Sequence, residues 1–202
     1  MSDSPPVPPG FPATFPDAAS LEELHAVMVR CTRCDLFMSR AQVVPGSGPS
    51  SPRVLLVGEA PGATEDREGV PFVGRSGALL ESMLAVAGLS RDAVFIANVV
   101  RCRPPKNRNP RTAEMRACAG WLAAQIRILD PPIIVTLGRC ALQRFIPEGK
   151  ITQLQAELQQ VTVEGRTLPL YPLLHPSAVL RNPTLRQSYE DQFGKLGGLI
   201  GG

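Results

Sequence analysis

The sequence is poor in histidine, in aromatic side chains and in long apolar runs. It has only two histidines, 5% aromatic residues and a net charge of +3. No apolar run approaches the ~20 residues that span a bilayer, and no cationic segment precedes an apolar one at the start, so we expect no membrane anchor and no secretory signal. The small net charge excludes a global basic field, so any nucleic acid would need a local basic patch. We therefore expect a cytoplasmic protein.

The chain is long enough to bury one hydrophobic core. A length of 202 residues is typical of a single domain. Residues 1–19 contain six prolines and few apolar side chains, a composition that predicts a flexible tail. The expected organisation is a Pro-rich tail over residues 1–19 and one domain over residues 20–202.

Short apolar runs alternate with amphipathic segments along that domain. We expect strands at 53–57, 94–100 and 133–137, and a hairpin over 161–174 whose second arm is a core strand. We expect helices after a capping box at residue 20 and over 77–87, 112–129, 138–145 and 184–199, with loops over 58–74 and 101–111. This alternation predicts an α/β sandwich with a mostly parallel sheet. Such sheets bind ligands beyond the carboxyl ends of their strands, where the loop after residue 57, Asn98 and His175 are expected.

Four of the five cysteines fall into two groups that suggest a metal site. Cys31 and Cys34 form a C-x-x-C pair, whereas Cys102 and Cys118 follow far downstream. Stable disulfides are rare in the cytoplasm, so clustered cysteines there more often bind metal. Zinc ribbons usually have two tight C-x-x-C pairs, so the wide second pair favours an iron–sulfur cluster. The alternative is four unrelated buried thiols, and Cys140 is assigned to packing.

The segment 58–66, GEAPGATED, is a glycine-containing loop with three acids. It lacks the G-x-G-x-x-G pattern of dinucleotide-binding loops and the Gly-Lys-Ser/Thr of a Walker loop. It offers exposed backbone and the carboxylates of Glu59, Glu65 and Asp66 at the end of a strand. The competing interpretation is a solvated acidic turn without a ligand.

Three side chains near strand ends suit a pocket for a flat base. The amide of Asn98 offers a donor and an acceptor, which match the O4 and N3–H edge of uracil and mismatch cytosine. His175 follows an apolar strand, where an imidazole can reach a ligand, and Phe72 can stack on a base from a Gly/Pro loop. The competing interpretations are a structural amide, a structural histidine and a core phenylalanine. His25 is expected to lie on the surface of the first helix.

The segment 101–111 carries five cations, three prolines and no acid. A charge run of this kind is usually a solvated face. The alternative is a stiff phosphate-binding patch, which the segment 181–183 would extend.

Together these stretches resemble the family-4 uracil-DNA glycosylases, the iron–sulfur-containing branch of that superfamily. The resemblance rests on GEAPGATED, PFVGRSG, ANVVRCRPPKNRNP and LLHPSAVLR with the four cysteines, and it covers nearly the whole chain from residue 20 onward. It implies a three-layer α/β/α sandwich with a central four-stranded parallel sheet. It also implies a monomer, associated with the nucleoid of a prokaryote, that flips uracil out of single- or double-stranded DNA. Hydrolysis of the N-glycosidic bond, with no lyase step, would then leave an abasic site.

The resemblance also gives the site residues their roles. It implies a structural 4Fe–4S cluster whose ligands are Cys31, Cys34, Cys102 and Cys118. Phe72 would stack on the flipped base, Asn98 would read its edge, and His175 would stabilise negative charge that develops on uracil O2. Gly58 and Ala60 would complete the substrate-binding loop.

The DNA contacts implied by the resemblance come from the basic loop and from the segment after His175. They are Arg103, Lys106, Arg108, Ser177, Val179, Leu180 and Arg181. Val179 or Leu180 is expected to act as an apolar wedge in the minor groove, filling the space that the flipped base leaves.

One departure concerns the group that activates water. The best-known members of the superfamily have Gly-Gln-Asp-Pro in this loop, whereas Ala60 replaces the aspartate here. Glu65 is the first candidate to replace it and Glu59 the second. Because uracil is a good leaving group, electrostatic stabilisation would then carry much of the catalysis.

Two rival functions remain open at this point. A nucleic-acid-binding module with an iron–sulfur cluster or zinc would explain the cysteines and the basic loop, but not Asn98, Phe72 or His175. A glycosylase for another deaminated or oxidised base would use the same scaffold with a different pocket.

Overall fold

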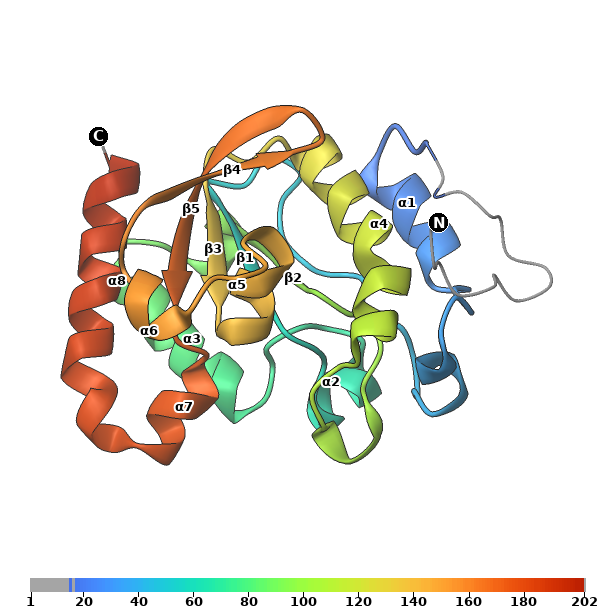
Figure 1. Cartoon of the computed structure of the whole chain (residues 1–202), viewed down its shortest axis with the longest axis horizontal. Helices are drawn as coiled ribbons and strands as arrows, with labels where there is room; N and C mark the ends of the chain where they lie inside the picture. Colours follow the sequence, from blue (N-terminus) through green and yellow to red (C-terminus); the bar gives the residue numbers. More distant parts are fainter. Residues whose placement is uncertain (1–14, 16, 202) are drawn as a thin grey trace.

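The computed structural model describes residue 15 and residues 17–201, and it shows one sheet between two layers of helices (Figure 1). The strands are β1 (Val54–Gly58), β2 (Val94–Asn98), β3 (Ile134–Leu137), β4 (Gln159–Val163) and β5 (Arg166–Leu173). Their order is β2-β1-β3-β5-β4. The first four in this order run parallel, and β4 pairs with β5 in an antiparallel hairpin. The predicted sandwich and its four parallel strands are therefore confirmed, and the hairpin adds a fifth strand at one edge.

Helices cover both faces of the sheet. One face carries α1 (Leu21–Met28), α4 (Thr112–Leu129) and α5 (Arg139–Phe145). The other carries α3 (Arg75–Val86), α7 (Pro176–Arg181) and α8 (Arg186–Gly201), and Figure 1 shows α3 and α8 on the side opposite α4 and α1. Two further short helices are α2 (Ala63–Glu68) and α6 (Ile151–Leu154). Single 3-10 turns lie at Asp35–Met38, Arg91–Ala93, Pro105–Asn107 and Pro183–Leu185.

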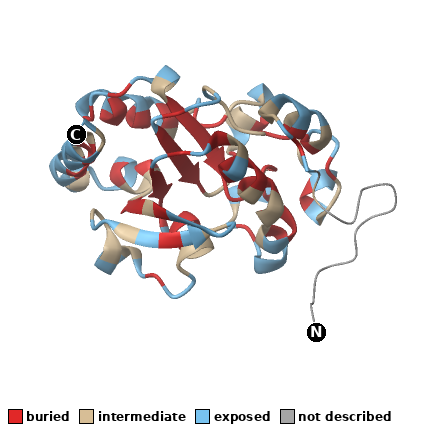
Figure 2. Cartoon of the chain, turned by 90° about the horizontal axis from the view of Figure 1, so that it is seen from above, coloured by how far each residue is buried: buried red, intermediate tan, exposed pale blue. Residues whose placement is uncertain are grey.

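The core is divided by the alternation of side chains along the strands. Leu55 and Val57 of β1 point to the α1/α4/α5 side, whereas Val54 and Leu56 point to the α3/α7/α8 side. Every residue of β1, β2 and β3 is buried, as expected of parallel strands covered on both faces. Figure 2 shows these buried strands at the centre and exposed residues on the outer surfaces of the helices.

The structure differs from the sequence prediction in several local features. Residues 58–74, expected to be a loop, contain α2, and residues 176–181 form α7 directly after His175. Each of these helices has six residues, too few to display a hydrophobic period. His25 is half-buried, because α4 covers its side of α1 and Gln125 Nε2 lies 3.0 Å from its Nε2. The prediction of a plain surface histidine is therefore wrong.

The Pro-rich tail lies mostly outside the described residues, but its last part packs on the domain. Phe15 contacts Trp121 edge-on, with ring centroids 5.1 Å apart, and Ala18 is buried. Asp17 pairs with Arg127 at 3.0 Å. Packed structure therefore begins before the predicted boundary at residue 20.

In the part of the chain that the structure describes, no helix combines the length and the apolar character needed to cross a membrane.

Candidate functional site

Two strand ends bring the predicted base-reading residues together. Gly58, the last residue of β1, pairs directly with Asn98, the last residue of β2. A Cβ atom on Gly58 would lie 2.4 Å from Asn98 Oδ1 and 2.6 Å from a ring carbon of Phe72. Only a glycine therefore allows the Asn98 amide and the Phe72 ring to meet at this point.

The Asn98 side chain has an unsatisfied acceptor. The residue is 2% exposed. Within the described part of the chain, no group donates a hydrogen bond to its buried Oδ1 atom. Because buried polar atoms are almost always paired, an orphaned oxygen beside Gly58 and Phe72 indicates an acceptor reserved for a ligand.

Phe72 is held in a backbone conformation that a bulky residue rarely adopts. Its φ is 53°, in the left-handed region. Arg91 donates to the carbonyl oxygens of Pro71 (2.5 Å) and Phe72 (3.1 Å). Gly77 lets α3 approach, since a Cβ there would lie 1.9 Å from the Phe72 carbonyl oxygen. Strain of this kind clusters at functional sites, and here the surrounding contacts fix the ring in one place.

Glu65 holds the same loop from the other side. Its Oε1 accepts from the amides of Val73 (3.1 Å) and Gly74 (2.9 Å), and its Oε2 accepts from Gly62 (3.1 Å). Both carboxylate oxygens are thus used to cap α2 and to tie the Phe72 loop to it. Its neighbour Asp66 is also structural, because its two oxygens accept from the amide of Ala41.

His175 is a neutral imidazole with its proton on Nε2. Its Nδ1 accepts from the Ser177 backbone N–H at 3.1 Å, and Ser177 Oγ lies 2.9 Å from the same atom. Burial and the nearby Arg181 lower the pKa of His175 from 6.5 to about 4. Its ring centroid lies 5.6 Å from that of Phe72. At neutral pH the residue therefore offers one N–H donor beside the Phe72 ring and no positive charge.

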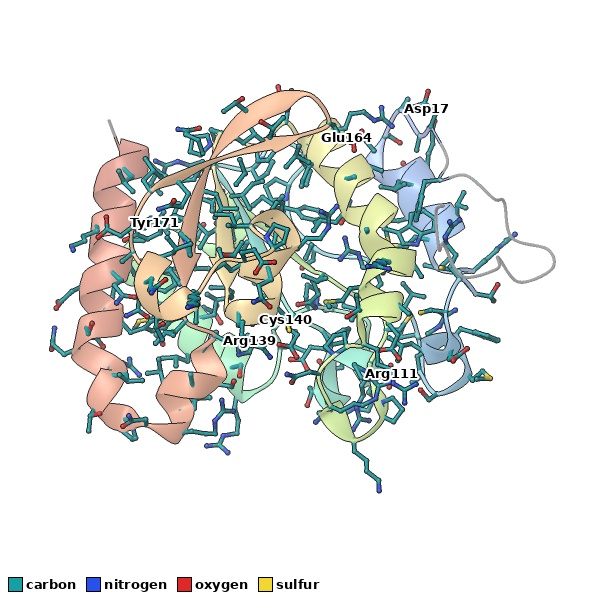
Figure 3. All side chains as sticks on the ribbon, in the orientation of Figure 1. Asp17, Arg111, Arg139, Cys140, Glu164 and Tyr171 are labelled. Carbon is teal, nitrogen blue, oxygen red and sulfur yellow. The ribbon has the colours of Figure 1, made fainter. Side chains whose placement is uncertain are left out.

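Glu59 and Cys140 connect the loop after β1 to the start of α5. The Cys140 thiol is buried near Glu59, and burial together with this carboxylate raises the pKa of Cys140 to about 12. Figure 3 shows Arg139 and Cys140 at the start of α5, where the chain leaves β3. Cys140 was predicted to pack in the core, and it is buried at 6% exposure. Ala60, which follows Glu59 in the chain, is half-buried against the core on the α1/α4/α5 side of the sheet.

The four cysteines of the two sequence groups line one cavity. Apart from Ala117, its remaining lining is cationic or aromatic, and it comes from α4, from the segment before β1 and from the loop after β2. The lining residues are Cys31, Arg33, Cys34, Arg40, Arg101, Cys102, Ala117, Cys118 and Trp121. Among the described residues, no three Cys, His, Asp or Glu side chains form a ready-made group for a single metal ion.

Donors point at the sulfur atoms of this cavity. Arg40 donates to Cys102 Sγ at 3.2 Å, and the Trp121 indole donates to Cys31 Sγ at 3.4 Å. As free thiols Cys34 and Cys118 are neutral, because burial raises the pKa of Cys34 to about 11 and that of Cys118 to about 12. N–H donors beside sulfur and an exclusion of water suit thiolates that a metal centre has deprotonated.

The basic loop is fastened to α4 by one of its own arginines. Arg108 forms a two-point ion pair with Glu114, whose side chain is 5% exposed, and Glu114 also accepts from the Arg111 amide. This pairing lowers the pKa of Glu114. The guanidinium of Arg108 is therefore occupied, whereas Lys106 is exposed and Arg103 is half-exposed with its Nε on Asn107.

Helix α7 separates the two wedge candidates. Val179 is 3% exposed and packs in the core with α3 and α8, whereas Leu180 is 36% exposed. The prediction of Val179 as a DNA-facing residue is wrong, because the short helix turns its side chain inward. Arg181 is exposed and donates to Ser177 Oγ at 3.3 Å, so Ser177 connects it to His175.

Sequence reasoning missed three residues that shape this site. Arg91 holds the Phe72 loop, Gly77 allows its close packing, and Arg101 lies buried in the lining of the cysteine cavity. Gly77 is the last residue of the PFVGRSG stretch, but its close approach to the Phe72 carbonyl could not be predicted from the sequence. Arg101 was counted among the five cations of the basic loop, but it is 1% exposed, so the prediction of a solvated or phosphate-binding cation is wrong for this residue. Nothing local distinguishes Arg91 or Arg101 from a surface arginine.

Comparison with known proteins agrees with this geometry. The sequence model of the uracil DNA glycosylase superfamily matches residues 45–195. The type-4 uracil-DNA glycosylase of Archaeoglobus fulgidus is 39% identical over 187 residues, which cover 90% of this chain and 94% of that protein. The type-4 enzyme of Sulfurisphaera tokodaii is 41% identical over 183 residues (88% and 83%), and that of Thermotoga maritima is 43% identical over 153 residues (76% and 79%). The chain therefore belongs to the uracil-DNA glycosylase superfamily, among relatives of type 4.

Proposed function

We propose that this protein is a DNA-repair enzyme that hydrolyses the N-glycosidic bond of uracil in DNA and leaves an abasic site. The observation that carries the proposal is the buried, unpaired Oδ1 of Asn98 between Gly58 and the Phe72 ring, at the strand ends that also position His175. Membership of the superfamily and the names of the type-4 relatives support it. The base must leave the stack to reach these residues.

Asn98 reads the base by its hydrogen-bonding pattern. Its Oδ1 accepts from uracil N3–H and its Nδ2 donates to uracil O4. Cytosine presents an acceptor at N3 and a donor at N4, so both contacts are lost and buried polar groups remain unpaired. Phe72 provides the flat apolar surface on which the base stacks.

His175 stabilises the leaving group. As the bond between C1′ and N1 lengthens, electrons move into the uracil ring and negative charge grows on O2. The Nε2–H of a neutral imidazole donates to this oxygen, from a position that the Ser177 contacts with Nδ1 fix in advance. Water then adds to the oxocarbenium-like sugar and loses its proton, which completes hydrolysis without a lyase step.

We assign water placement to Glu59 and loop positioning to Glu65. The Glu65 carboxylate is occupied by three backbone amides, so its contribution acts through the position of Phe72. Glu59 follows β1 directly and is half-buried, and its carboxylate caps none of the backbone amides that Glu65 holds. This reverses the order of preference that the sequence alone suggested.

The cysteine cavity fits a 4Fe–4S cluster. The four thiols of Cys31, Cys34, Cys102 and Cys118 face one space, and N–H donors point at two of the sulfur atoms. When bound, a cluster supplies a covalent crosslink between the segment after α1, the basic loop and α4. We propose this structural role, because the cavity does not include Asn98, Phe72 or His175.

DNA contacts extend on either side of the base site. The exposed cations Lys106 and Arg181 and the half-exposed Arg103 contact phosphates, and Leu180 is the wedge that occupies the space left by the flipped base. The protein acts as a monomer on single- or double-stranded DNA containing uracil. Arg108 contributes indirectly, because its pairing with Glu114 holds the basic loop in place.

Strand cleavage by alkali, after incubation with a labelled oligonucleotide carrying one uracil, tests this proposal. The wild type is expected to cut at uracil alone, and Asn98→Ala is expected to lose at least about a hundredfold in rate. A matched oligonucleotide with cytosine at the same position is the control. Wild-type protein that binds the uracil oligonucleotide without cutting it would favour a binding module, and cleavage only at hypoxanthine or 5-hydroxymethyluracil would favour another damaged base.

A further inference from the structure

Arg101 is a charged side chain inside the protein. It is 1% exposed and is among the largest fully buried side chains. Its main chain is fixed, because its carbonyl oxygen accepts from the Val44 amide at 2.8 Å. Placing an unpaired guanidinium in the interior is strongly unfavourable, so the surroundings must supply compensating negative charge.

The hydrogen-bond partner of Arg101 does not supply that charge. Its Nη2 donates to the neutral amide oxygen of Gln125 at 2.5 Å. Gln125 in turn donates through Nε2 to Pro45 O (2.8 Å) and to His25 Nε2 (3.0 Å), which orients its oxygen toward Arg101. Among the described residues, Arg101 pairs with no carboxylate, and its Nε and Nη1 have no hydrogen-bond partner.

The free side of Arg101 belongs to the cysteine cavity. Arg101 is part of its lining, together with all four cysteines of the two sequence groups. Cys102 and Cys118 line the same cavity as Arg101 and are the ionisable groups there that could balance its charge. Neutral thiols would leave the guanidinium uncompensated, whereas thiolates bound to metal would balance it.

We propose that Arg101 is the buried counter-cation of the metal–thiolate group in this cavity, and that it raises the reduction potential of that group. The inference rests on the cluster assigned to the four cysteines above. An iron–sulfur cluster with four thiolate ligands carries net negative charge and gains one more on reduction. A buried cation stabilises the reduced form more than the oxidised form, and net charge is one of the factors that set such potentials.

Arg40 offers a comparison in the lining of the same cavity. It donates to Cys102 Sγ at 3.2 Å and to Cys31 O at 2.6 Å, but it is only half-buried. Water screens its charge, so its effect on the potential should be smaller than that of Arg101.

The test compares the wild type with Arg101→Gln, Arg101→Lys and Arg40→Gln, each purified without oxygen. Iron and sulfide are measured per polypeptide, and the potential is taken from a redox titration followed by visible absorbance. Arg101→Gln is expected to lose iron several-fold, and the molecules that keep it are expected to have a lower potential. Arg101→Lys should remain close to the wild type, and Arg40→Gln should show a smaller shift.

Iron content and potential equal to those of the wild type in Arg101→Gln would overturn the inference. If Arg101→Gln does not fold, the iron content of Arg101→Lys distinguishes the two possible roles of this side chain. A charge-balancing role predicts that Arg101→Lys keeps its iron, whereas a purely shape-filling role predicts that it loses its iron. Uracil excision provides a separate readout. Wild type that excises uracil without iron would overturn this inference alone, and wild type with iron but no excision would overturn only the glycosylase.

Discussion

At the scale of single residues, Glu65 and Glu59 differ in what their carboxylates hold. Glu65→Gln removes an acceptor from a set of three backbone amides, so we expect a lower melting temperature together with slower uracil excision. Glu59→Gln leaves those amides paired, so we expect slower excision with little change in melting temperature. Single-turnover rates and thermal unfolding of both variants measure this difference. Slow excision by Glu65→Gln at unchanged melting temperature would return the catalytic role to Glu65.

His175 makes the stability of the fold depend on pH. Its folded-state pKa of about 4 lies below the ordinary value of 6.5, so between these values the unfolded chain binds more protons than the folded one. Stability should therefore fall as the pH drops below 6.5, by about 3 kcal/mol near pH 4. His175→Gln should lack this part of the loss. Urea unfolding of the wild type and of His175→Gln, each near neutral pH and near pH 4, measures the loss of unfolding free energy. Equal losses in the two proteins would contradict the low folded-state pKa of His175.

The same ring sets the acid limit of catalysis. In the proposed mechanism His175 Nδ1 accepts from Ser177 during excision, which the imidazolium cannot do. The pH–rate profile of the wild type should therefore stay flat through 6.5 and fall only as the pH approaches 4. A fall centred on 6.5 would mean that the imidazole titrates as a solvent-exposed group.

At the scale of elements, α7 places two neighbouring apolar residues in different environments. Leu180→Ala removes an exposed side chain, so excision from duplex DNA should fall while stability changes by less than about 0.5 kcal/mol. Val179→Ala leaves a cavity in the core and should cost about 2 kcal/mol of stability. Excision from single-stranded and duplex substrates, with urea unfolding, separates the two. Full duplex activity in Leu180→Ala would remove the wedge role.

Elements with strong local signals were predictable from the sequence. The helix at 112–129 was predicted with the bounds it has, because an apolar stripe runs along it and the two prolines after residue 130 end it. The hairpin predicted over 161–174 also forms, with its turn at Glu164 and Gly165, which both adopt the positive φ that this turn requires. Signals of this kind lie within a few residues of the element that they define.

Features that depend on distant contacts were not predictable. The six-residue α2 exists because Glu65 caps it while holding Gly74 nine residues away. The orientation of Val179 follows from packing against α3 and α8 rather than from a period. The identities of Asn98, Phe72 and His175 were available from the sequence, but the neutral state of His175 needed its contact with Ser177 and its burial.

At the scale of the whole molecule, the start of the described chain is part of the domain. Phe15 lies against Trp121, and the Arg33 guanidinium stands 4.1 Å from the centroid of its ring. These contacts join the segment before α1 to α4 and to the residues between Cys31 and Cys34. We expect Phe15→Ala to lower the free energy of unfolding by about 2 kcal/mol, through lost burial and lost aromatic contact.

The contact between Phe15 and α4 determines whether Gly120→Ala stabilises or destabilises the protein. It lies within α4, where replacing glycine by alanine should stabilise a helix by about 1 kcal/mol. A Cβ at this position, however, would lie 2.2 Å from a ring carbon of Phe15. Gly120→Ala should therefore destabilise the wild type and stabilise Phe15→Ala, a coupling that a double-mutant cycle in urea detects. Stabilisation by the same amount in both backgrounds would mean that Phe15 does not occupy this site in solution, and the domain would then begin at the capping box of α1.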